Sequence, residues 1–173
     1  MVHKYYVTLL KKMFTSGTKI IQKDILYILN NPWDVTNQEW DLGTNNSPKH
    51  VLESILKKLS FCKKDGFSKI WKTGNNEPIA ILGFYSVNEK TYRSIFIASK
   101  YMEDHAFYIT RDLRKTIMEK TKTYLDCKCG LYSSSTHPQH IKWFALLGFE
   151  YRPEENIGSL RFFEFVFPGK GII

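Results

Sequence analysis

Four side chains suited to binding a soft metal ion lie close together in the second half of the sequence. They form Cys127-x-Cys129 followed by His137-x-x-His140, a set of thiols and imidazoles that zinc commonly uses. The gap between the two cysteines is shorter than structural zinc sites usually have, and cysteines two apart on a strand share one face. Buried thiols and two histidines on a helix account for the pattern better than a metal centre, so we expect no bound metal.

The sequence around these residues alternates between patterns typical of helices and of strands. Ser47-Pro48 is typical of a helix start, because serine caps the first turn and proline is tolerated at its first position. Three apolar runs follow this helix with short polar turns between them, which predicts an antiparallel meander. We expect helices over 20–31, from 48 onward, over 110–125 and over 138–147, and strands over 67–73, 78–87, 92–102, 127–134, 149–152 and 160–167.

This order of elements predicts a mixed sheet with helices packed on it, in the α/β class. Hairpins cannot join parallel strands, so any parallel pair must meet across the long helix. Residues 3–10 fit either a strand or a helix, and residues 32–48 are polar and irregular, with two tryptophans embedded in them. We therefore divide the chain into an N-terminal extension, 1–46, which packs on the domain, and the domain itself, 47–173.

Composition restricts the class of protein. The 173 residues are 43% hydrophobic and 15% aromatic, which excludes a disordered chain and supplies a sizeable core. Three cysteines without an apolar leader segment predict a reduced protein that is not secreted. No stretch approaches the ~20 apolar residues of a membrane-spanning helix, so we expect no membrane span.

Positive charge is concentrated in the first part of the chain. The formal net charge is +8, and residues 1–74 carry twelve lysines against six acidic residues, a net charge of +6. A basic excess speeds encounters with polyanions, so one interpretation is a weak nucleic-acid contact through residues 1–74. The lysines are scattered and form no dense basic arm, which favours an ordinary solvated surface.

The end of the sequence carries a pattern that resembles a known family. The stretch His-Pro-Gln-His-Ile-Lys-Trp-Phe-Ala-Leu-Leu-Gly-Phe at 137–149 resembles the Asn-x-x-Ala-x-x-x-Tyr-x-x-x-Gly-Phe motif of the GNAT acetyltransferases, with His137 at the asparagine and Phe144 at the tyrosine. The order of elements from residue 47 also fits that family. The resemblance implies a GNAT-like domain over 47–173, whose central sheet is mostly antiparallel and flanked by helices.

A closer resemblance is to the GNAT-like internal virion protein A family of short-tailed bacteriophages. It rests on Leu113–Glu119, on His140–Phe144 and on the last strand around Phe162–Val166, and it covers residues 67–170. This branch implies a role in virion assembly or as a protein-interaction module, with phage virion or host proteins as partners. It also implies a location in the host cytoplasm or in the virion.

The GNAT resemblance implies an acetyl-CoA site whose backbone cradle for the pyrophosphate lies between the fourth strand and the long helix. Glycine permits the close approach of backbone to phosphate, yet residues 102–112 contain none, and Glu103 and Asp104 would repel a phosphate there. Cations on the long helix could replace part of this cradle. The cofactor-binding candidates are Ile97, Ala98, Arg111, Arg114, Lys115 and Phe144.

The groups that would move protons are also altered. The family's proton-donating tyrosine falls on Phe144, which has no proton to give. His137 is a candidate replacement acid and Glu103 a candidate base, although a histidine before a proline and an acid on a loop are more often surface residues. With both family features missing we expect no cofactor, or acetyl-CoA if the chain is an active enzyme.

Three functions remain open from the sequence. The first is a GNAT-like bacteriophage protein that acts in virion assembly or interaction and has a degenerate acetyl-CoA site. The second is an active acetyl-CoA-dependent N-acetyltransferase, and it rests on the fold, which does not by itself imply function. The third is a nucleic-acid-binding module, which rests on charge alone. Binding of acetyl-CoA separates the first two, and a steep salt dependence of DNA binding would identify the third.

Overall fold

The computed structural model describes residues 14–167, so the element expected at 3–10 lies outside the described residues. The strands are β1 (Phe14–Gly17), β2 (Gly66–Thr73), β3 (Pro78–Asn88), β4 (Thr91–Ala98), β5 (Lys128–Ser133), β6 (Glu150–Tyr151) and β7 (Arg161–Val166). The helices are α2 (Gln22–Asn30), α3 (Asp34–Glu39), α4 (Pro48–Lys64), α5 (Met102–Lys120) and α6 (Pro138–Leu146), with a short 3-10 helix, η1 (Pro153–Glu155).

The seven strands form one mixed sheet in the order β1-β2-β3-β4-β5-β7-β6. Every neighbouring pair is antiparallel except β4 and β5, which are parallel and are connected through α5. The predicted class, a mixed and mostly antiparallel sheet, is confirmed. So are the meander of β2, β3 and β4 and the meeting of the parallel strands across the long helix.

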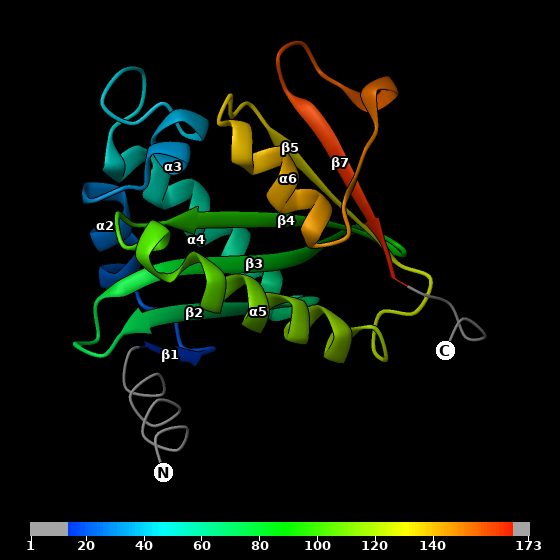
Figure 1. The fold of residues 1–173 in the computed structure, drawn as a ribbon, viewed down its shortest axis with the longest axis horizontal. Coiled ribbons are helices and arrows are strands. Elements are labelled where there is room, and N and C mark those ends of the chain that lie inside the picture. The colour runs from blue at the N-terminus through cyan, green and yellow to red at the C-terminus, as the bar shows by residue number, and fades with distance from the viewer. Residues whose placement is uncertain (1–13, 168–173) are drawn as a thin grey trace.

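Helices cover both faces of the sheet (Figure 1): α2, α3 and α4 lie on one face, and α5 and α6 lie on the other. Successive residues of a strand point to opposite faces. Ile81 of β3 and Ile97 of β4 therefore pack with α2 and α4, whereas Leu82 and Ala98 pack with α5. The core thus consists of two apolar layers, one on each face of the sheet.

The described part of the N-terminal extension joins the sheet and the core. Phe14 of β1 pairs with Thr73 of β2, and Ile25 of α2 is fully buried in the same cluster as Ile55 of α4. Ser47 caps α4 as expected, because its hydroxyl accepts the N–H of His50 at 3.3 Å. The domain boundary proposed at residue 46 stays a prediction.

The junction of β4 and α5 differs from the expectation. The strand ends at Ala98, and the long helix begins at Met102 rather than at residue 110. The turn is fixed by Ser99, whose hydroxyl donates to the carbonyl of Pro78 at 2.7 Å and whose own carbonyl accepts the N–H of Met102 at 2.9 Å. The segment expected to be an open loop is therefore the first half of a helix.

The end of α5 and the structure of residues 32–48 were also predicted wrongly. Helix α5 ends at Lys120 rather than 125, and Asp126 adopts a positive φ of 60° as the chain turns into β5. The short helix α3 lies within residues 32–48, which were expected to be irregular. Its first turn carries Asp34, which is favourable beside a helix N-terminus.

No helix among residues 14–167 is long and apolar enough to cross a membrane.

Candidate functional site

Strands β4 and β5 part from one another after a short parallel ladder. They pair at Thr91 with Lys128, at Tyr92 with Cys129 and at Arg93 with Gly130, and the register ends there. A cavity of about 280 Å³, here called the α3–α4 cavity, opens beside this split on the face of α3 and α4. A second cavity of about 310 Å³, the α5–α6 cavity, opens between the first turns of α5 and α6.

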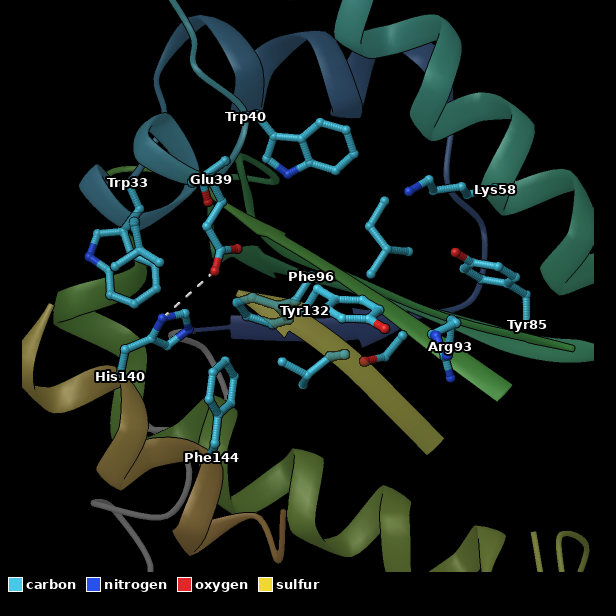
Figure 2. A pocket seen from close by; sticks show the side chains of 15 residues that line it. Trp33, Glu39, Trp40, Lys58, Tyr85, Arg93, Phe96, Tyr132, His140 and Phe144 are labelled. Carbon is cyan, nitrogen blue, oxygen red and sulfur yellow. Dashed lines mark ion pairs between the residues drawn. The ribbon is translucent and has the colours of Figure 1, made fainter. Parts of the chain in front are cut away.

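Trp33 lies where the two cavities meet, because Trp33 and His140 line both of them. Its ring centroid lies 6.0 Å from that of His140 and 6.1 Å from that of His137, and its indole N–H donates to Glu103 at 3.3 Å. This one side chain therefore links the segment before α3 to the beginnings of α5 and α6, and Figure 2 shows it beside His140.

The last residue of β4 is bonded to the same segment of the chain. The carbonyl of Ala98 accepts the N–H of Trp33 at 2.9 Å, and the N–H of Ala98 donates to the hydroxyl of Thr36 at 2.9 Å. Both backbone polar groups of Ala98 are thus satisfied from within the chain, so neither is free to bond to a ligand.

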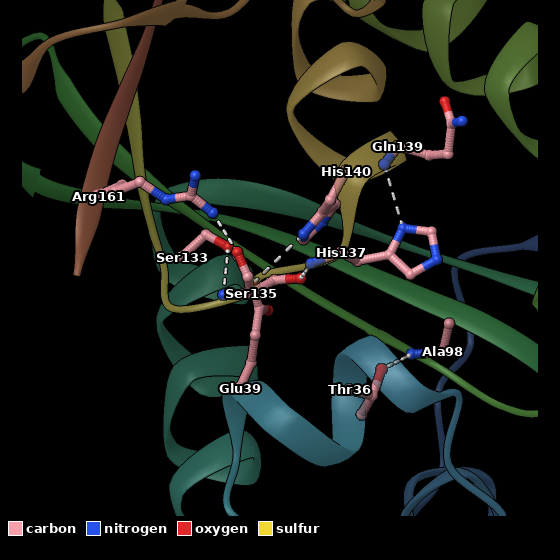
Figure 3. A network of polar contacts seen from close by, with 9 residues as sticks. All are labelled: Thr36, Glu39, Ala98, Ser133, Ser135, His137, Gln139, His140 and Arg161. Atoms are coloured by element: carbon pink, nitrogen blue, oxygen red, sulfur yellow. Dashed lines mark hydrogen bonds and ion pairs between the residues drawn. The ribbon is translucent and has the colours of Figure 1, made fainter. Parts of the chain in front are cut away.

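Glu39 is the one carboxylate among residues 14–167 that lines the α3–α4 cavity. Its Oε1 accepts the hydroxyl hydrogen of Ser133 at the end of β5, and Nδ1 of His140 lies 3.8 Å from the same oxygen (Figure 3). Burial raises the pKa of Glu39 to about 7, and the hydrogen bond from Ser133 offsets only part of that rise. A carboxylate with this pKa can exchange a proton near neutral pH.

His140 is buried beside Glu39, with only 4% of its surface exposed. Its Nδ1 atom has no hydrogen-bond partner within residues 14–167. Burial lowers the pKa of His140 to about 4, with smaller contributions from His137 and Arg161. The imidazole is therefore neutral at pH 7, and in its Nε2–H tautomer the Nδ1 atom can accept a hydrogen bond from a molecule in the cavity.

The structure places two of the proposed catalytic residues in the α5–α6 cavity. His137 caps α6, since its Nδ1 accepts the N–H of Gln139 at 3.3 Å. Glu103 lies exposed on the first turn of α5, where it accepts the indole N–H of Trp33. Phe144 is buried, with ring centroids 4.2 Å from His140 and 4.8 Å from Phe163. Catalytic roles for these residues stay predictions.

The cations proposed to replace the phosphate cradle lie elsewhere. Arg111, Arg114 and Lys115 are exposed and line a separate hollow between α5 and the end of α6. Arg111 is nine residues after Met102, which places it roughly 13 Å along the helix axis from the first turn. Ile97 is fully buried against α2 and α4. The structure does not bring these four residues together around the start of α5.

The cysteine and histidine set has no metal-site geometry in the described part of the chain. Residues 14–167 contain no group of three or more His, Cys, Asp or Glu side chains placed to hold a metal ion. Cys127 and Cys129 are buried in an aromatic cluster with Phe84 and Tyr124. Burial raises the pKa of Cys129 to about 12, so its thiol is protonated at neutral pH.

Comparisons with known proteins identify the fold. No protein-family model matches the sequence, and no curated protein matches it either. Among solved structures, a phosphinothricin acetyltransferase of the GNAT superfamily from Sinorhizobium meliloti, in complex with acetyl-CoA, has a TM-score of 0.63 at 12% identity, covering 93% of this chain and 92% of that one. An N-acetyltransferase from Thermoplasma acidophilum in complex with coenzyme A has a TM-score of 0.62 at 11% identity and covers 89% and 99%.

A spermidine N-acetyltransferase variant from Vibrio cholerae is also similar, with a TM-score of 0.57 at 15% identity over 89% of this chain and 94% of that one. Identities this low establish the fold alone. The chain therefore has the fold of the GNAT acetyltransferases, as the motif at its end implied. The bacteriophage branch stays a prediction.

The start of α5 does not fit the pyrophosphate of acetyl-CoA. Only three residues, Ser99–Tyr101, connect β4 to α5, and none is a glycine. Ser99 is fully buried, and the first helical turn carries Glu103 and Asp104. A phosphate needs free backbone N–H groups and a positive field at a helix start, and two acidic side chains oppose that field. The residues at the start of α5 therefore do not fit acetyl-CoA.

Thr36→Val tests the contact that closes the end of β4. Thr36 is buried, and valine keeps its shape but removes the hydroxyl that accepts the N–H of Ala98. We expect a loss of about 1–3 kcal/mol in the free energy of unfolding, because a buried N–H is left without a partner. Urea denaturation measures the loss. Thr36→Ser keeps the hydroxyl as a control, and equal stability of the two variants would contradict the assigned bond.

Proposed function

We propose that this chain is a GNAT-fold protein that binds a small ligand in the α3–α4 cavity and does not transfer an acetyl group from acetyl-CoA. The observation that carries the proposal is the pair of hydrogen bonds that Trp33 and Thr36 make to the backbone of Ala98. A cofactor arm could bond to this residue only after those two contacts broke, at a cost of about 1 kcal/mol or more for each.

The N-terminus of α5 gives independent support for the absence of acetyl-CoA binding. Glu103 and Asp104 occupy the first turn of α5, and the indole N–H of Trp33 donates to Glu103. The first turn of α5 is thus acidic, and the end of β4 is already bonded from within the chain. The α3–α4 cavity on the other face remains open and holds Glu39 and the unpartnered Nδ1 of His140. A cavity lined by a few converging polar groups, one of them without a partner among residues 14–167, is the usual starting hypothesis for a ligand site.

Calorimetric titration with acetyl-CoA tests the proposal. We expect no binding with a dissociation constant below about 1 mM, whereas the Sinorhizobium meliloti acetyltransferase titrated in parallel supplies the positive control. Trp33→Ala should not restore binding, because the acidic first turn of α5 and its glycine-free connection remain. Micromolar binding by the unmodified chain, or release of free CoA thiol with an amine, would overturn the proposal.

An active N-acetyltransferase is the second candidate function. The observation that favours it is Glu39, since a carboxyl with a pKa of about 7 is suited to remove a proton from an acceptor ammonium. The acetyl-CoA titration separates the two candidates, because this second function requires the cofactor to bind.

The virion role is the more specific form of the first proposal, and it rests on the resemblance to the internal virion protein A family. A ligand-binding or interaction module needs no acetyl-CoA, which agrees with the closed end of β4. We propose the host cytoplasm or the virion as its location. Mass spectrometry of purified particles tests this: stoichiometric amounts of the chain are expected, and its absence from particles would remove the virion role.

A further inference from the structure

The α3–α4 cavity has two chemically different ends. Figure 2 shows Glu39 and His140 at one end and Lys58, Tyr85 and Arg93 at the other. We call Glu39 and His140 the accepting end, and Lys58 and Arg93 the cationic end. This polarity restricts the ligand more sharply than the fold does, because each end attracts a different functional group.

The cationic end is built from side chains without an acidic partner. Within residues 14–167 neither Lys58 nor Arg93 forms an ion pair. Lys58 is half-buried with its Nζ 5.4 Å from the ring centroid of Trp40, and the guanidinium of Arg93 lies 5.7 Å from that of Tyr132. Two cationic side chains that lie over aromatic rings at one end of the cavity favour an anionic ligand group such as a carboxylate.

The accepting end offers hydrogen-bond acceptors that are not saturated. Among the described residues, 14–167, Nδ1 of His140 is buried without a hydrogen-bond partner, and Glu39 receives one hydrogen bond, from Ser133. His137 and Arg161 are the other charged or titratable groups that act on His140. A primary ammonium carries three N–H donors and no acceptor, so it matches this end.

Aromatic side chains line the space between the two ends. Phe96 and Tyr132 lie between them in Figure 2, with Phe144 and Trp40 on either side. The cavity volume of about 280 Å³ is at the small end of the range for ligand sites. The middle of the ligand is therefore short and apolar.

We propose that the α3–α4 cavity binds a small linear zwitterion, with its primary ammonium at Glu39 and His140, its carboxylate at Lys58 and Arg93, and a short methylene chain between them. The inference rests on the proposed function in that it takes this cavity as the ligand site. An α-amino acid fits less well, because its two charges are adjacent whereas the two ends of the cavity are separated by aromatic rings.

Calorimetry with a series of ω-amino acids tests the ligand class. The series is γ-aminobutyrate, δ-aminovalerate, ε-aminocaproate and the next two homologues, so that one spacer matches the cavity. Hexylamine lacks the carboxylate, hexanoate lacks the ammonium, and norleucine is the α-amino isomer of ε-aminocaproate. We expect one member to bind at least about tenfold more tightly than all three controls. Its affinity should rise between about pH 6 and 8 as Glu39 ionises.

Two variants assign the ends of the bound ligand. Glu39→Gln should weaken the best ligand by about tenfold or more and abolish the rise with pH. Lys58→Met should weaken it to a similar degree, whereas Lys57→Met, an exposed lysine on the same helix, should leave it unchanged. Circular dichroism and the thermal midpoint establish that each variant is folded before it is titrated.

The outcomes separate this inference from the proposed function. If acetyl-CoA binds, the proposed function fails, and the ω-amino acid series still decides what the cavity recognises. If acetyl-CoA does not bind and no ω-amino acid exceeds the controls, the zwitterion inference fails by itself. Equal binding of hexylamine and ε-aminocaproate would also overturn it, because the cationic end would then have no role.

Discussion

Gly66→Ala is expected to lower the free energy of unfolding by about 4 kcal/mol, at the upper end of what single substitutions cause. Gly66 begins β2 with a φ of +150°, a conformation that side chains rarely adopt. A Cβ built there would lie 1.8 Å from the carbonyl oxygen of Phe84, a backbone atom of β3 that cannot rotate away. The β2–β3 ladder would have to shift to relieve the overlap.

The effect should reach the candidate site, because Gly66 pairs directly with Tyr85, which lines the α3–α4 cavity. Gly17→Ala is the matched control: Gly17 lies in β1, and a Cβ there would meet no atom within 4 Å. We expect that control to change stability by less than about 0.5 kcal/mol. Urea denaturation of both variants measures the difference, and equal midpoints would contradict the assigned backbone overlap.

Much of the fold could be predicted because its strands carry local signals. The meander of β2, β3 and β4 consists of apolar runs separated by turn residues, and these short-range patterns agree with the final pairing. The start of α5 could not be predicted in the same way. Tyr101, Phe107 and Tyr108 favour strands locally, and the turn depends on the bond between Ser99 and Pro78, which are 21 residues apart.

The residues of the candidate site also fall into those that local sequence could predict and those that it could not. Phe144 and His137 could be singled out from the sequence because they belong to one motif at one helix, in which position along the chain fixes position in space, and their roles stay predictions. Glu39 was missed because its partner Ser133 is 94 residues away, and its own segment has no periodic pattern. Trp33 lay in a segment expected to be irregular, and only the packing of α3 against the end of β4 shows where it points.

The pH dependence of stability should contain two opposing contributions from the buried pair at the accepting end. The pKa of Glu39 is raised from 4.5 to about 7 on folding, so the folded protein binds more protons than the unfolded chain between those values, and stability falls as pH rises through them. The pKa of His140 is lowered from 6.5 to about 4, so its contribution to stability rises with pH between 4 and 6.5. In the unmodified protein the two slopes oppose each other where their ranges overlap.

Substituting either residue alone should therefore reveal a change of unfolding free energy with pH, and the two variants should show slopes of opposite sign. In Glu39→Gln the histidine contribution remains, and the free energy of unfolding should rise by up to about 3 kcal/mol from pH 4 to 6.5. In His140→Asn the carboxyl contribution remains, and stability should fall by a similar amount from pH 4.5 to 7. Urea denaturation at half-unit pH steps measures both profiles. The comparison uses slopes rather than absolute stabilities, so a uniform loss from either substitution does not disturb it. Parallel profiles in the two variants would show that Glu39 and His140 do not titrate as their burial requires.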